Sequence, residues 1–136
     1  MFALIRHAGY GIATGSLTSE GRGQAIALAE ALKQAGSWKE IRTSPTPRTR
    51  ETAVILGEAL SIPVIEDARL GVDGELSDLM PPTEPHGILF ISHLPVLSRM
   101  LRAWSREFGC EEPPLTEIAS GYIVDPSKRL LSAVKG

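Results

Sequence analysis

Short apolar runs alternate along this chain with longer segments in which apolar residues recur every three or four positions. The short runs are expected to form strands, at residues 2–5, 38–43, 62–65 and 87–92. The longer segments are expected to form helices, at residues 18–36, 47–60 and 95–108. Such alternation produces β-α-β units, whose right-handed crossovers lay parallel strands side by side in one sheet.

The last part of the chain departs from this alternation. Two strand-like runs, Gly121–Val124 and Leu130–Val134, are separated by the turn-forming residues 125–128. We therefore expect an α/β fold, a three-layer α/β/α domain with a mostly parallel central sheet and an antiparallel C-terminal hairpin or edge. The length of 136 residues suits one domain spanning 1–136.

Charge and hydropathy exclude several classes of protein. A net charge of −2 provides no basic surface for nucleic acid. The longest apolar runs are too short to span a membrane, and the N-terminus does not resemble a signal peptide. The single cysteine, Cys110, excludes an internal disulfide framework and suits a reducing compartment. We expect a cytoplasmic protein without nucleic-acid or membrane partners.

Histidine and arginine residues follow three of the predicted strands. The first strand runs into Arg6 and His7, the second into Ser44 with Arg48 close behind, and the fourth into Ser92 and His93. In open α/β sheets, ligands bind beyond the carboxyl ends of the strands. A single histidine at such a place is most often a hydrogen-bonded boundary residue, but two beside arginines indicate a site.

The predicted second helix has Arg48 and Arg50 in its first turn, where the helix dipole disfavours cations. A bound oxyanion would remove this conflict, and a guanidinium group matches phosphate with two hydrogen bonds. Clustered histidines can instead bind a metal, but His7 and His93 are accompanied by arginines rather than by cysteine or carboxylate ligands. We therefore expect a phosphate site and no metal, with His86 uninvolved in its Pro-rich loop.

Four segments of the chain, taken in order, resemble the histidine phosphatase (phosphoglycerate mutase-like) superfamily. They are LIRHA at 4–8, LTSEGRGQA at 17–25, SPTPRTRETA at 44–53 and SH at 92–93. The short length and the sequence Ser92-His93-Leu94-Pro95 resemble the SixA-type protein phosphohistidine phosphatases within this superfamily.

The resemblance implies a phosphatase that forms a phosphohistidine intermediate. His7 would be the nucleophile, and Arg6, Arg48 and His93 would bind the phosphate oxygens together with it. No cofactor would be required. The partner would be a protein carrying phosphohistidine or a small phosphoester, with inorganic phosphate occupying the site as product. The alternative is a non-catalytic protein of the same fold that binds phosphate or a phosphoprotein without hydrolysing it.

Two features depart from the family pattern. Ala8 stands where the family usually has glycine, and a positive φ there would cost an alanine about 1–2 kcal/mol. The second departure concerns the general acid, a carboxylate that many family members supply from the segment after the third strand. Asp73 and Glu75 are candidates by their position in the segment 66–87, which is too short for a sizeable lid, but solvated loop carboxylates are an equally good interpretation.

Overall fold

The computed structural model describes residues 1–115 and 117–136. Six strands form one sheet in the order β3-β2-β4-β1-β5-β6. The strands are β1 (Phe2–Arg6), β2 (Glu40–Thr43), β3 (Val64–Glu66), β4 (Ile88–Ser92), β5 (Ser120–Asp125) and β6 (Leu130–Lys135). The first four are parallel to one another, and β5 and β6 join them antiparallel at one side. The expected α/β fold with an antiparallel C-terminal edge is thus confirmed.

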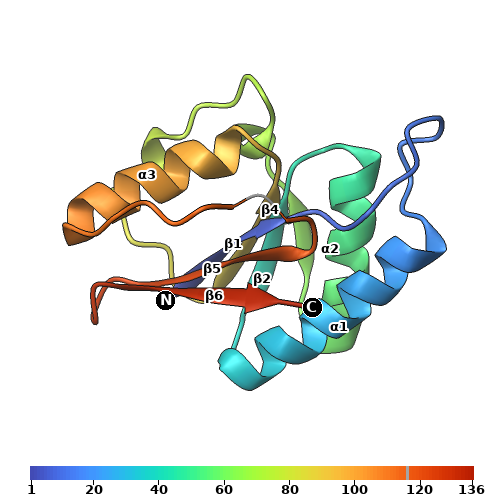
Figure 1. The fold of residues 1–136 in the computed structure, drawn as a ribbon, viewed down its shortest axis with the longest axis horizontal. Coiled ribbons are helices and arrows are strands. Elements are labelled where there is room, and N and C mark those ends of the chain that lie inside the picture. The colour runs from blue at the N-terminus through green and yellow to red at the C-terminus, as the bar shows by residue number, and fades with distance from the viewer. Residues whose placement is uncertain (116) are drawn as a thin grey trace.

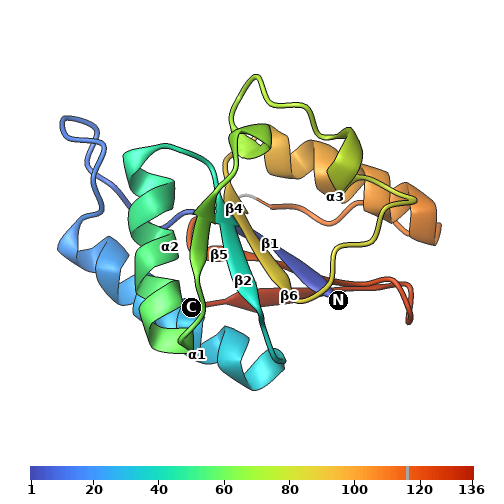
Figure 2. The same ribbon diagram turned by 180° about the vertical axis from the view of Figure 1, so that it is seen from behind.

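Three α-helices cover the two faces of the sheet. They are α1 (Ser19–Ala35), α2 (Pro47–Leu60) and α3 (Val96–Phe108). Helices α1 and α2 lie together on one face, and α3 lies on the other (Figures 1 and 2). Among the described residues, no helix is long and apolar enough to cross a membrane.

Strand β1 is apolar on both sides because both faces of the sheet are covered. Phe2 and Leu4 pack in the cluster beneath α3, whereas Ala3 and Ile5 pack in the cluster beneath α1 and α2. All four side chains are completely buried. Alternate side chains of a strand point to opposite faces, so the continuous apolar run at 2–5 corresponds to a central strand.

Two strands begin later than expected. Strand β2 was expected from Trp38, but Trp38 instead donates its indole N–H to the Leu32 carbonyl and packs against the end of α1, so the strand starts at Glu40. Strand β3 was expected at 62–65 and lies at Val64–Glu66. Pro63 precedes it and has no N–H for a strand ladder.

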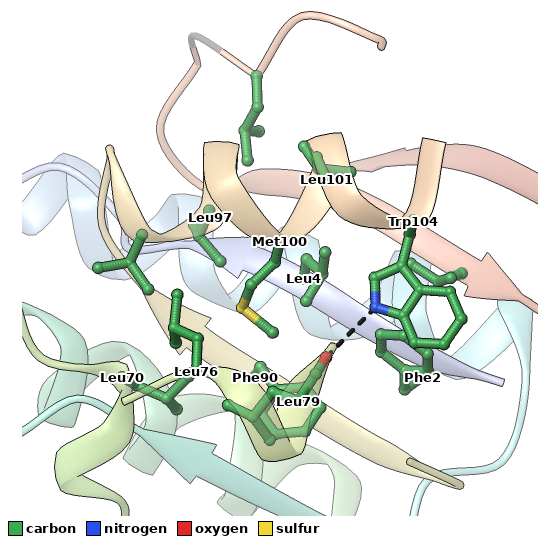
Figure 3. Close-up of a cluster of buried hydrophobic side chains, with 13 residues drawn as sticks. Phe2, Leu4, Leu70, Leu76, Leu79, Phe90, Leu97, Met100, Leu101 and Trp104 are labelled. Carbon is green, nitrogen blue, oxygen red and sulfur yellow. Dashed lines mark hydrogen bonds between the residues drawn. The ribbon is translucent and has the colours of Figure 1, made fainter. Parts of the chain in front are cut away.

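The segment between β3 and β4 is built into the core rather than into a lid. It contains two short 3-10 helices, η1 (Ala68–Leu70) and η2 (Ser77–Leu79). Leu70, Leu76 and Leu79 pack beneath α3, and the Trp104 indole N–H donates to the Leu79 carbonyl at 3.3 Å (Figure 3). The carboxyl edge of the sheet is therefore bordered by loops and helix ends.

Candidate active site

The strand register brings His7 and His93 together. Arg6 of β1 is paired with Ser92 of β4 in the parallel ladder. His7 and His93, which follow these two residues, therefore lie at the same level along the strands. The centroids of the two imidazole rings are 5.8 Å apart, and the ring planes are inclined at 58°. Both residues are almost completely buried. Two histidines far apart in the sequence therefore share one place at the carboxyl edge of the sheet.

His7 keeps a lone pair on its Nε2 atom. Its Nδ1 lies 2.9 Å from the Ala8 carbonyl oxygen. A carbonyl oxygen only accepts hydrogen bonds, so this contact assigns the proton to Nδ1. Burial lowers the pKa of His7 below its usual value, and the charges of Arg48 and Arg6 lower it further, while the bond to Ala8 opposes the shift. At neutral pH the ring is uncharged, as a nucleophilic imidazole must be.

His93 presents its other nitrogen differently. Its Nε2 lies 2.7 Å from the Ser44 hydroxyl oxygen. Its Nδ1 is buried and has no hydrogen-bond partner among the described residues. Burial lowers the pKa of His93 to about 4, with further contributions from the charges of Arg48, His7 and Arg6. A buried polar atom without a partner is costly, and at this position it indicates a place for a ligand.

Arg48 lies beside the two histidines in the first turn of α2. Its Nε is buried and has no hydrogen-bond partner among residues 1–115 and 117–136. Its guanidinium carbon lies 4.8 Å from the centroid of the Tyr10 ring, a cation–π contact. The Tyr10 ring in turn meets the His7 ring edge-on, with 5.3 Å between centroids. Through Tyr10, these contacts place a cation near the imidazole of His7.

Arg6 contributes a second positive charge. It is the last residue of β1 and is half-buried next to His7. Its charge lowers the pKa of both His7 and His93. Two guanidinium groups and two neutral imidazoles thus surround one small region, a combination suited to a phosphate group.

Two other arginines near Arg48 in the sequence, Arg42 and Arg50, are paired with carboxylates. Arg42 forms ion pairs with Glu40 and Asp67, and Arg50 forms one with Glu66. Arg50 and Glu66 are both about half exposed. Although Arg48 and Arg50 occupy the same helical turn, only Arg48 acts electrostatically on the two histidines.

Ala8 fits its position without strain. Its backbone N–H donates to the Thr52 hydroxyl at 3.0 Å, and the same hydroxyl donates to the Arg48 carbonyl at 2.8 Å. Its methyl group is completely buried beside Leu17 and Ala25. Ala8 does not have a positive φ, so the strain that would demand glycine is absent here.

The two candidate general acids, Asp73 and Glu75, lie on the exposed loop between η1 and η2. Glu75 accepts a hydrogen bond from the Ser77 backbone N–H at 2.9 Å. The hydrogen bonds from Ser77 hold the pKa of Glu75 below its usual value. A general acid working at neutral pH benefits from a raised pKa, so the local structure gives Glu75 the opposite shift.

Three polar side chains of the site carry roles that the sequence patterns left unassigned. Tyr10, Ser44 and Thr52 contact Arg48, His93 and the Ala8 backbone, respectively. The sequence signal that could have identified Tyr10 is an aromatic residue between two glycines, three positions after His7. For the two hydroxyls no pattern was available, because their partners are set by the pairing of β1, β2 and β4.

The described residues contain no group of three or more histidine, cysteine or carboxylate side chains placed to hold a metal ion. The chemical character of the site is that of an anion site, because arginines rather than carboxylates accompany the histidines.

Comparison with known proteins agrees with this chemistry. The sequence profile of the histidine phosphatase superfamily (branch 1) matches residues 5–71. This match includes the segments around His7 and Arg48. No curated protein sequence matches the chain.

Solved structures resemble the fold over most of the chain. The protein histidine phosphatase SixA complexed with tungstate superposes with a TM-score of 0.75 at 21% identity, covering 98% of this chain and 96% of that chain. A mycobacterial glucosyl-3-phosphoglycerate phosphatase complexed with VO3 has a TM-score of 0.60 at 17% identity, covering 97% and 95%. Phosphoglycerate mutase from Plasmodium falciparum has a TM-score of 0.60 at 22% identity, covering 99% and 87%. The fold is thus that of the histidine phosphatase structures, and the profile of this superfamily matches residues 5–71 of the chain.

Proposed function

We propose that this protein is a metal-independent phosphatase that uses Nε2 of His7 as its nucleophile and removes phosphate from phosphohistidine in proteins. The observation that carries the proposal is the pairing of two neutral, buried imidazoles with Arg48. Nδ1 of His93 and Nε of Arg48 are buried without partners among the described residues. A phosphoryl group between them would accept both hydrogen bonds.

In the first step, the Nε2 lone pair of His7 attacks phosphorus. The bond between phosphorus and the substrate imidazole breaks, and its electron pair stays with the leaving nitrogen. If the substrate ring is protonated on its other nitrogen, it leaves neutral. His7 keeps the proton on Nδ1, which remains hydrogen-bonded to the Ala8 carbonyl, and the ring becomes a phosphorylated imidazolium.

In the second step, water attacks the phosphorus on His7, the Nε2–P bond breaks and its electron pair returns to Nε2. Both water hydrogens leave with the phosphate. Arg6, Arg48 and the Nδ1–H of His93 stabilise the charge on the phosphoryl oxygens. Phosphoryl transfer is catalysed mainly by positioning and electrostatic stabilisation, which arginines supply without a metal.

Phosphohistidine is favoured over other substrates by two observations. The segment between β3 and β4 packs its leucines into the core instead of forming a lid, which suits a substrate presented by another protein. The loop carboxylate Glu75 has a lowered pKa, which suits a leaving group that needs no general acid. The fold similarity to SixA, a protein histidine phosphatase, is consistent with this substrate.

The test compares kcat/KM on a protein phosphohistidine with kcat/KM on a panel of small phosphomonoesters. We expect the phosphoprotein to be the better substrate. A small phosphomonoester is the second candidate, supported by the fold similarity to a glucosyl-3-phosphoglycerate phosphatase. Turnover of small esters with none on the phosphoprotein would establish that alternative.

The same assay separates catalysis from binding. His7→Ala should abolish turnover, and His86→Ala is the matched control because His86 is exposed in the loop before β4. If the wild-type protein is stabilised by phosphate against heat but hydrolyses none of the substrates, the chain is a phosphate-binding module and the proposal is wrong.

A further inference from the structure

The hydroxyl of Ser44 is held against His93 by a rigid backbone. The Ser44 N–H donates to the Ile91 carbonyl at 3.0 Å, and the Ser44 carbonyl accepts from the Thr49 hydroxyl at 2.6 Å. Ser44 itself is completely buried. Its hydroxyl oxygen therefore has a fixed position, 2.7 Å from Nε2 of His93.

A neutral imidazole carries one proton, so the two nitrogens of His93 have opposite roles. If Nε2 carries the proton, it donates to Ser44, and Nδ1 is left with a lone pair. If Nδ1 carries the proton, the Ser44 O–H donates to Nε2. Both arrangements satisfy the bond between Ser44 and His93 in the absence of an anion.

Only one arrangement suits a phosphate group. A lone pair on Nδ1 would repel the phosphoryl oxygens, whereas an Nδ1–H would donate to them. Nδ1 is the nitrogen of His93 that has no partner in the described part of the chain, so it is the one available to a ligand. The phosphate-binding state thus requires Ser44 to act as donor and Nε2 as acceptor.

We propose that Ser44 is a positioning residue that stabilises the phosphate-binding Nδ1–H tautomer of His93 by donating its hydroxyl proton to Nε2. This inference rests on the proposed function, because it assumes that the anion bound beside His93 is a phosphoryl group. Ser44 does not touch the substrate; it supplies the hydrogen bond that Nε2 of His93 accepts when Nδ1 carries the proton. Its removal should therefore change the hydrogen-bonding state of His93 as well as the rate.

The direct test is nuclear magnetic resonance of the full chain with 15N-labelled histidine, saturated with inorganic phosphate. Ring correlations report which nitrogen of His93 carries the proton. We expect Nδ1–H in the phosphate-bound wild type and in Ser44→Thr, which keeps a hydroxyl. In Ser44→Ala, Nε2 has no donor in this tautomer, so we expect titration with inorganic phosphate to give a Kd about tenfold higher than in the wild type. Ser105→Ala is the matched control, since Ser105 is a buried serine of α3 whose hydroxyl donates to the Leu101 carbonyl.

A double-mutant cycle tests the effect on rate. In His93→Asn, the side-chain amide N–H2 replaces the Nδ1–H and has no tautomers. We expect Ser44→Ala to lower kcat/KM by about tenfold to a hundredfold with His93 present, in line with the loss of one hydrogen bond to a charged group. In the His93→Asn background, the same substitution should have at most a small effect.

Two results would overturn the proposal. The first is an Nε2–H tautomer of His93 in the phosphate-bound wild type. The second is a Ser44→Ala protein that binds inorganic phosphate as tightly as the wild type does. Since the resonance measurement requires phosphate binding alone, it gives an answer even if the wild-type protein hydrolyses no phosphohistidine, so failure of the proposed function is recognised separately.

Discussion

The guanidinium group of Arg48 lies over the ring of Tyr10, 4.8 Å from its centroid, and the same ring packs nearly perpendicular to the imidazole of His7. Tyr10 therefore holds the cation near His7, the proposed nucleophile, before any phosphate is bound. A cation–π contact at a partly exposed site contributes about 0.5–1 kcal/mol.

Replacement of Tyr10 should weaken phosphate binding by a small amount. We expect Tyr10→Leu to raise the Kd for inorganic phosphate about two- to fivefold, because Arg48 must then be ordered by the ligand itself. Tyr10→Phe keeps the ring and should bind like the wild type. Isothermal titration calorimetry measures both, and equal Kd values for Tyr10→Leu and the wild type would contradict this role.

The two arginines of the first turn of α2 should behave very differently. Arg48→Ala removes a cation beside both histidines, and we expect kcat/KM to fall by about 10²–10³, as when one oxyanion donor is lost. Arg50→Ala removes only the exposed ion pair with Glu66 and should change kcat/KM by less than about twofold. Similar losses in the two variants would show that the first turn acts as a whole rather than through Arg48.

Replacement of the loop carboxylates tests the need for a general acid. Because Glu75 is exposed and has a lowered pKa, we expect Glu75→Gln to leave phosphohistidine hydrolysis unchanged. Asp73→Asn should do the same, with Asp78→Asn as a control on the neighbouring 3-10 helix. A large loss of kcat on an alkyl phosphate, but not on phosphohistidine, would identify the replaced carboxylate as the acid for poorer leaving groups.

The buried histidines should make the free protein sensitive to mild acid. The pKa of His93 is lowered to about 4 in the folded state, so between pH 6.5 and 4 the unfolded chain binds a proton that the folded chain does not. Neutral, buried His93 contributes roughly 3 kcal/mol to the free energy of unfolding above pH 6.5, and this contribution is lost as the pH falls to 4. His7, whose pKa is also lowered, acts in the same direction.

Urea denaturation in phosphate-free buffer at several pH values measures this dependence. The free energy of unfolding of His93→Asn should fall less steeply between pH 6.5 and 4 than that of the wild type. Identical slopes would mean that His93 binds its proton over the same pH range in the folded and unfolded states, so that its pKa is not lowered by folding.

The fold, and the meeting of His7 and His93 at one edge of the sheet, could be predicted because they follow from periodicity and from strand ends. The apolar run at 2–5 predicts a central strand, and a central parallel strand places the following Arg6 and His7 at the carboxyl edge of the sheet. The same reasoning applies to His93 after β4. The boundaries of β2 and β3 were less predictable, because Trp38 packs as a core residue without joining the ladder.

The detailed contacts could not be predicted from sequence. Whether the Ser44 hydroxyl meets His93 depends on the register of β2 against β4, in which Thr43 is paired with Ile91. The separation of Arg48 from Arg50 depends on Glu66, at the end of a strand that is distant in sequence. Whether alanine is tolerated at position 8 depends on the backbone φ angle there, which the residue type alone does not determine.

The most direct test of the account is to trap the phosphorylated enzyme. The protein is mixed with a phosphohistidine-bearing substrate, quenched in alkali to preserve phosphohistidine, and digested for mass spectrometry. We predict a phosphoryl group on His7, present in His86→Ala and absent in His7→Ala. Turnover by a folded His7→Ala protein, or a phosphoryl group found on His93 instead, would contradict the central claim.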